Sequence, residues 1–170
     1  MRRLALIFCL LASPAAAEID PCIVGVWRLQ SPDMTSFWSQ MAAPMQVETV
    51  SVNGAAQVGA DGMLQMVMSN GYGRMSNAGI AFEARFDGRF AAQAESQGNQ
   101  LRSEIVDALF NFEVRMITAD GTNPVMQQVQ NGMETVEERV NVHSYVCTDT
   151  TLQLRHSSGE PSPFDNWVRQ

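Results

Sequence analysis

Apolar and polar residues alternate along much of the chain with a period of two. Over residues 64–68, leucine and methionine alternate with other side chains, and the same alternation occurs over 80–86 and 140–146. Successive side chains of a β-strand point to opposite faces of the sheet. This period therefore predicts strands that bury one face and expose the other.

Dipeptides that favour tight turns recur between these segments. Glycine accepts a positive φ and Asn or Asp tolerates one, so Asn-Gly and Asp-Gly pairs indicate turns. The pairs are Asn53-Gly54, Asp61-Gly62, Asn70-Gly71, Asp87-Gly88, Gly98-Asn99, Asp120-Gly121 and Ser158-Gly159. Short strands about 8–12 residues apart, with turns between them, are typical of an antiparallel sandwich or barrel. The pattern therefore predicts an all-β fold.

A segment after the first predicted strand has a helical period instead. Its apolar residues fall at i, i+3, i+4 and i+7, and they are Met34, Phe37, Trp38 and Met41. Ser31 is a suitable N-cap, Pro32 suits the first helical position, and Pro44 follows the end. We expect a short amphipathic helix here.

A second segment, 124–132, admits two interpretations. Asn131-Gly132 is a hairpin signal, but that register would place apolar Val129 opposite Glu134. In a helix, Val129 would share an apolar face with Met133, and Asn123-Pro124 is a helix start signal. We favour a helix over 124–132, with the hairpin as the alternative, so the fold would hold one or two short helices.

The first residues have the pattern of a secretory signal peptide. Arg2 and Arg3 precede an apolar stretch over 4–12, and residues 13–17 end in Ala-x-Ala. The apolar stretch is too short to span a bilayer as a helix, and no later stretch is long and apolar enough to do so. We expect a signal peptide over 1–17, one domain over 18–170, and a periplasmic or secreted protein. A buried N-terminal helix is the alternative.

The charge of the chain disfavours some classes of partner. The full chain has 11 basic and 18 acidic residues, for a net charge of -7, and removal of Arg2 and Arg3 would make it -9. An acidic protein is poorly suited to phosphate backbones and anionic membranes. We therefore expect no nucleic-acid partner, whereas a basic partner protein remains possible.

Cys22 and Cys147 are the cysteines that remain after residue 17. Two cysteines in an exported chain most simply form a disulfide. A redox pair is the alternative, but the sequence has no Cys-x-x-Cys.

These features together resemble the lipocalins and their calycin relatives, and most closely a group of bacterial secreted lipocalin-like proteins. The residues that carry the resemblance are Cys22, Gly25-Val26-Trp27, Asp61-Gly62, Tyr145-Val146-Cys147, Leu152-Gln153-Leu154 and Trp167-Val168-Arg169. The resemblance implies an antiparallel up-and-down β-barrel of about eight strands around a central cavity for a small hydrophobic ligand.

The resemblance also implies how the barrel closes. In that family the first-strand tryptophan, preceded by the glycine at the position of Gly25, packs against an arginine near the end of the chain. Here Trp27 would contact Arg155 or Arg169, in a cation–π interaction that joins the first strand to the last. This would be a structural role.

We expect no catalysis, no metal and no cofactor. The two histidines, His143 and His156, flank the turn after Cys147. Placing Val142 and Val146 on the apolar face sets His143 opposite Arg155 and leaves the two histidines on opposite faces. No nucleophile, phosphate-loop or zinc motif is present.

Methionines are frequent in the first half of the mature chain, and flexible, polarizable methionine suits adaptable apolar pockets. With neighbouring aromatic residues they could line a ligand cavity or simply fill the core. The candidate ligand-binding residues are Met34, Phe37, Trp38, Met41, Met66, Met68, Phe82 and Phe86. By the calycin resemblance, the helix would act as a lid. The alternative function is a protein-interaction module with a filled barrel, such as a periplasmic inhibitor of a hydrolase.

Overall fold

The computed structural model describes residues 18–30, 34–41, 45–118, 121–131, 140–157, 159, 162 and 165–170. The predicted signal peptide over 1–17 lies outside the described residues. So do Ser31, Pro32 and Pro44, which were expected to bound the first helix.

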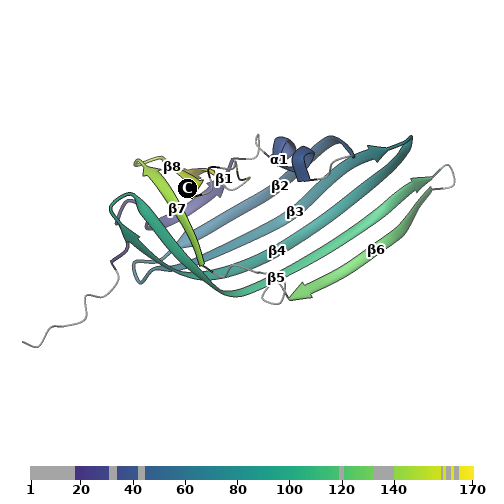
Figure 1. Ribbon diagram of the computed structural model, residues 1–170. Coiled ribbons are helices and arrows are strands. Elements are labelled where there is room, and N and C mark those ends of the chain that lie inside the picture. Colours follow the sequence, from purple (N-terminus) through teal and green to yellow (C-terminus); the bar gives the residue numbers. More distant parts are fainter. Residues whose placement is uncertain are drawn as a thin grey trace, which may run out of the picture.

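Nine antiparallel strands and one helix make up the described part of the chain (Figure 1). The elements are β1 Gly25–Leu29, α1 Met34–Met41, β2 Gln46–Val58, β3 Met63–Asn77, β4 Ile80–Gln97, β5 Gln100–Thr118, β6 Gly121–Asn131, β7 Val140–Cys147, β8 Thr151–His156 and β9 Asn166–Arg169. The helix confirms the 3.6-residue period of the Met34–Met41 segment.

Eight of these strands close a ring. The sheet order runs β4-β3-β2-β1-β9-β8-β7-β5, and β4 also pairs with β5, which joins the two ends. All pairs are antiparallel, and β1 pairs with β9 through Trp27 and Arg169. Most strands pair with the strand that follows them in the sequence. The predicted all-β, antiparallel, barrel-like fold is confirmed.

One edge of β5 is shared by two strands. Residues 100–104 of β5 pair with β7, and residues 109–118 pair with β6. The preferred helix over 124–132 is thus wrong, because 124–131 belong to β6. The unpaired edge of β5 offers a row of N–H and C=O groups that a strand satisfies and a helix would not. Pro124 lies opposite Arg115, where the register shifts, which is a position that tolerates proline.

The sheet continues well beyond the ring. We call this part the extended sheet; it comprises residues 46–54, 69–77, 80–88 and 105–118 together with β6. Figure 1 shows these strands running on past β1, β7 and β8 as a long curved sheet. The inner face of the extended sheet is apolar, and Val50, Met75 and Ala84 are buried on it. The helix α1 packs against β2 at this part of the molecule.

Three of the predicted turns lie inside strands instead, namely Asn53-Gly54 in β2, Asn70-Gly71 in β3 and Asp87-Gly88 in β4. Two of these glycines provide space for aromatic rings. A Cβ at Gly88 would lie 2.5 Å from Cδ1 of Phe110, and a Cβ at Gly71 would collide with Phe86. Asn70 has φ 52 and lies at a register shift. The pairs mark bulges and close packing there rather than chain reversals.

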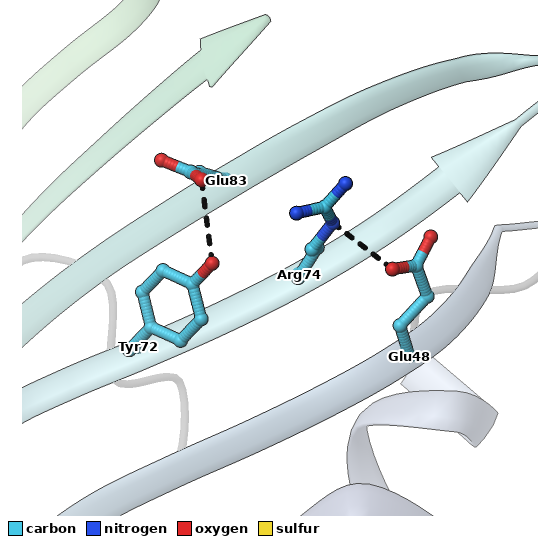
Figure 2. A network of polar contacts seen from close by, with 4 residues as sticks. All are labelled: Glu48, Tyr72, Arg74 and Glu83. Carbon is cyan, nitrogen blue, oxygen red and sulfur yellow. Dashed lines mark hydrogen bonds and ion pairs between the residues drawn. The ribbon is translucent and has the colours of Figure 1, made fainter. Parts of the chain in front are cut away.

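The outer face of the extended sheet is polar. Figure 2 shows two of its contacts, which link β2, β3 and β4. Arg74 Nε lies 3.0 Å from Glu48 Oε2, and the hydroxyl of Tyr72 donates to Glu83 Oε1 at 3.3 Å. An exposed ion pair such as Arg74–Glu48 adds only about 0–1 kcal/mol to the free energy of unfolding, so these contacts stabilise the fold little.

Candidate functional site

Residues 18–24 cross one end of the ring and close it. Ser96 Oγ at the end of β4 accepts a hydrogen bond from Asp20 N at 2.6 Å, and Cys22 is bonded to Cys147 of β7. Ile23 is fully buried and its carbonyl accepts a hydrogen bond from Trp27 Nε1 at 2.7 Å. The segment thus forms a floor held from both sides.

Arg169 joins this floor to the last strand. Its guanidinium lies 4.3 Å from the ring centroid of Trp27. It also donates to the carbonyl oxygens of Cys22 at 2.6 Å, Val24 at 2.9 Å and Asp149 at 2.9 Å. Arg155, the other arginine considered from the sequence, is exposed on β8. Gly25 has φ +144 and a Cβ there would lie 2.5 Å from Arg169 Nη1, so the glycine gives the arginine its space.

The predicted disulfide is confirmed: Cys22 and Cys147 are bonded, with an S–S distance of 2.10 Å. Beside it, the hydroxyl of Tyr145 lies 2.8 Å from Asp20 Oδ2 and 2.8 Å from the carbonyl oxygen of Gly98. Burial, and then the hydrogen bond to Asp20, raises the pKa of Tyr145 to about 12. The tyrosine therefore stays protonated as a donor over the physiological range.

A cavity of about 440 Å³ lies inside the ring above this floor. Most of its wall is apolar, and all eight strands of the ring contribute residues to the wall. The apolar lining residues are Ile23, Trp27, Ala56, Val58, Leu64, Met66, Met68, Phe90, Leu101, Ile105, Ala108, Phe110, Leu152, Leu154 and Trp167. The volume falls in the range of about 300–1,000 Å³ that holds small-molecule ligands in proteins.

The residues predicted to bind ligand lie in three places. Met66 and Met68 line the cavity. Phe82 and Phe86 lie on β4 in the extended sheet, outside the cavity lining. Met34 of α1 is buried in the core, and Trp38 packs against Phe86 with ring centroids 5.6 Å apart. The side chains of Phe37 and Met41 lie outside the described residues.

The polar residues of the cavity wall are grouped on one side. They are Ser103, Asn141, His143, His156 and Ser162. Ser103 of β5 is the strand partner of Asn141 of β7, and His143 of β7 is the partner of His156 of β8. The strands β5, β7 and β8 are neighbours, so the two pairs lie side by side on the inner face.

The expected histidine geometry is wrong. His143 lies opposite His156, not opposite Arg155, and the two rings meet edge to face with centroids 5.2 Å apart. The reason is that β7 buries Tyr145 and leaves Val146 63% exposed, so the face expected to be apolar points outward. A signal was available: Tyr145 and His143 are two residues apart and therefore share a face.

Burial lowers the pKa of His143 below its usual value of 6.5, and the neighbouring His156 lowers it further. A neutral imidazole presents one N–H donor and one nitrogen acceptor. At neutral pH, His143 can thus both donate to and accept from a group placed in the cavity. Among the described residues, no group of three or more His, Cys, Asp or Glu side chains could hold a metal ion.

The geometry defines a class: a small all-β protein whose ring-like sheet encloses an apolar cavity with a polar side. No known protein family, curated protein or solved structure matches this chain. None of the helical residues described forms a stretch of the length and apolar character needed to span a bilayer.

Proposed function

We propose that this protein binds a small hydrophobic ligand in the cavity of its ring and performs no chemistry on it. The observation that carries the proposal is the cavity itself, about 440 Å³ in volume with an apolar wall. Well-packed interiors leave few voids larger than a water molecule, so a space of this size suits an occupant. Lipocalin-like proteins, which the sequence resembles, use a barrel cavity in this way.

Flexible side chains on the wall support an adaptable pocket. Met66 and Met68 reach the cavity from β3, and thioether side chains adjust to irregular apolar shapes at little cost. Phe90 of β4 and Phe110, which belongs to the extended sheet, continue the apolar wall. In the extended sheet, Trp38 of α1 packs against Phe86. We propose that α1 is the lid of the pocket.

The disulfide is compatible with a secreted protein, since such bonds persist in oxidising compartments. We propose that the chain works in the periplasm or outside the cell after loss of residues 1–17. There it would carry or sequester its ligand.

The proposal can be tested by a substitution that fills the cavity and a measurement of ligand binding. Ala108 lines it, whereas Ala91, on the same sheet, is not part of its lining. Ala108→Leu should weaken binding of an environment-sensitive apolar dye by about tenfold or more, and Ala91→Leu should leave the affinity within about twofold. Native mass spectrometry of the mature protein should show a co-purified small molecule that Ala108→Leu reduces.

Thermal unfolding should show that both leucine variants are folded. Absence of dye uptake and of any bound molecule in the wild-type protein would refute the proposal. Equal dye binding by the two variants would place the dye elsewhere and count against the cavity as the site.

A further inference from the structure

We propose that two copies of this protein pair through the outer edge of β6, so that their extended sheets join into one continuous antiparallel sheet. The partner is a second copy of this chain, and its binding does not depend on the ligand proposed above.

The extended sheet has two edges, because it continues beyond the strands that close the ring. Its first strand is β2, and β1 pairs with β2 only along residues 55–58. Its last strand is β6, which pairs with β5 alone in the part of the chain that the structure describes. Figure 1 shows β6 along one side of the long sheet. An edge strand presents a row of backbone N–H and C=O groups that another strand can satisfy.

The sequence of β6 does not protect this edge from another strand. Edge strands that stay single are commonly short, or they carry charged residues, above all lysine. β6 spans 11 residues and contains no Asp, Glu, Lys or Arg. Its one proline, Pro124, lies near the start, so each of residues 125–131 keeps its backbone N–H. The composition of β6 therefore favours pairing with a further strand.

The edge of β2 differs in both respects. The helix α1 packs against β2, and Glu48 of this strand is paired with Arg74 of β3. Pairing of β2 with β6 of another copy would be head-to-tail, and such contacts build open-ended fibres unless they close into a ring. Pairing of β6 with β6 uses the same edge on both copies and is complete with two.

A neutral edge also suits the charge of the molecule. The full chain has a net charge of -7, so two copies repel each other at long range. Like charges directly opposite each other destabilise a pair of strands, and β6 against β6 places none there. Asn and Gln are frequent in β6, and an amide both donates and accepts hydrogen bonds, so it can pair with its own kind. A second copy therefore fits this edge chemically.

The symmetry of the pair joins the apolar inner faces of the two extended sheets. Identical antiparallel strands are related by a two-fold axis, and an axis perpendicular to the sheet keeps the same face of both copies on one side. On β5, next to β6, Phe112 lies opposite Phe86 of the inner face. Met116 lies opposite Phe82, and both of these β5 residues are partly buried. The apolar inner face would thus continue from one copy to the other.

A single pair of strands buries little surface, so the association should be weak. The 11 residues of β6 span about 36 Å at about 3.3 Å per residue. A contact of this length and one strand wide is smaller than the roughly 800 Å² per partner of a standard interface. We expect a dimer with a Kd of about 1–100 µM.

Sedimentation velocity of the mature protein between about 1 and about 300 µM should show a shift from monomer to dimer. The lysine variant is Gln127→Lys, Val129→Lys, and the glutamate variant is Gln127→Glu, Val129→Glu. Each should weaken the dimer by about tenfold or more, because like charges then meet across the two-fold axis. The two positions lie opposite Glu113 and Asn111 of β5 in the register, so the charges are not introduced opposite apolar residues.

An equimolar mixture of the lysine and glutamate variants should recover a dimer at least as tight as the wild type, because unlike charges then meet. Recovery on mixing also excludes a folding defect as the cause of the weakening. The matched control is Thr49→Lys, Ser51→Lys, at exposed positions of β2, and it should leave the Kd within about twofold.

A wild-type protein that stays monomeric at about 300 µM would overturn the proposal. A mixture of the two charge variants that stays monomeric would also overturn it, since the β6 strands would then not meet. Equal weakening by the β2 control would assign the contact to the other edge. Growth beyond the dimer would indicate head-to-tail pairing, and either result would contradict the pairing of β6 with β6.

Discussion

At the scale of single residues, Arg169 combines three hydrogen bonds to backbone carbonyls with a contact over Trp27. The planar guanidinium presents donors in several directions at once, which a lysine ammonium on its flexible stem does not reproduce. The three carbonyls belong to residues 22, 24 and 149, so one side chain ties the floor to the β7–β8 turn.

Substitution of this arginine should be costly. Arg169→Ala should lower the free energy of unfolding by about 2–4 kcal/mol, because it leaves partly buried carbonyls without their donor and uncovers the indole of Trp27. Arg155→Ala, on exposed surface of β8, should change it by less than about 0.5 kcal/mol. Urea unfolding followed by tryptophan fluorescence measures both, and similar values for the two variants would contradict the assigned role.

Tyr145 should limit the stability of the folded protein at alkaline pH. Its pKa is raised to about 12 in the folded state, from 10.0 for the free side chain. The stability from its buried, hydrogen-bonded hydroxyl is therefore complete below pH 10 and is lost as the pH rises from 10 toward 12. The midpoint of urea unfolding should fall over this range, and Tyr145→Phe should remove the part of that fall due to this group.

Tyr72 provides the control, because its hydroxyl lies on the outer face of the extended sheet. Tyr72→Phe should retain the alkaline loss that Tyr145→Phe removes. At neutral pH, Tyr145→Phe should itself cost about 1–3 kcal/mol, since the Asp20 carboxylate loses a donor. An identical pH dependence in all three proteins would exclude Tyr145 as the responsible group.

Individual residues predict a contact from the sequence when few residues of that type are present, as with the cysteines. Two cysteines beyond residue 17 allow one intramolecular pairing, and it is the pairing found. The sequence could not choose between Arg155 and Arg169, because that depends on which late strand lies next to β1. The histidine pair was missed because Val142 and Val146 suggested the wrong buried face, and only the burial of Tyr145 sets the register.

At the scale of elements, strand identity followed from period two, but strand length did not. Asn-Gly and Asp-Gly pairs suggested many short strands, whereas β3, β4 and β5 span 15, 18 and 19 residues. Glycine within a strand can accommodate a neighbouring ring, as Gly88 does for Phe110, and its local sequence looks the same as in a turn. Only the cross-strand partner distinguishes the two uses.

The expected helix over 124–132 is wrong for a related reason, because 124–131 lie in β6. The apolar residues of this segment fit a helix, and the edge of β5 that it completes becomes evident only when β5 is known to extend to Thr118. The local sequence pattern is a weak predictor of secondary structure where a long neighbouring strand provides hydrogen-bonding groups. By contrast, α1 has no strand pattern to compete with, and the expected helix is present.

At the scale of the whole molecule, the ring depends on contacts between distant parts of the chain. The disulfide joins residues 125 apart. In the chain-entropy treatment, a loop of this length corresponds to about 5 kcal/mol, and native disulfides of small secreted domains contribute about 2–5 kcal/mol.

Removal of the disulfide should therefore weaken the fold substantially. Cys22→Ser, Cys147→Ser should lower the free energy of unfolding by about 2–5 kcal/mol, and reduction of the wild type should have the same effect. Urea unfolding with and without reductant measures this. Identical unfolding of the wild-type protein with and without reductant would contradict this contribution of the disulfide.

The pairing of β9 between β1 and β8 has a consequence for the order of folding. Strand β9 is made after all of the other strands, so the sheet can form from β2 onward but cannot close until the last four-residue strand has emerged. Until then β1 and β8 present open edges that can pair with other chains. Closure brings together residues about 140 apart in sequence, which is slow to achieve by diffusion of the chain. The molecule thus acquires its interior space in a late step, after most of its secondary structure.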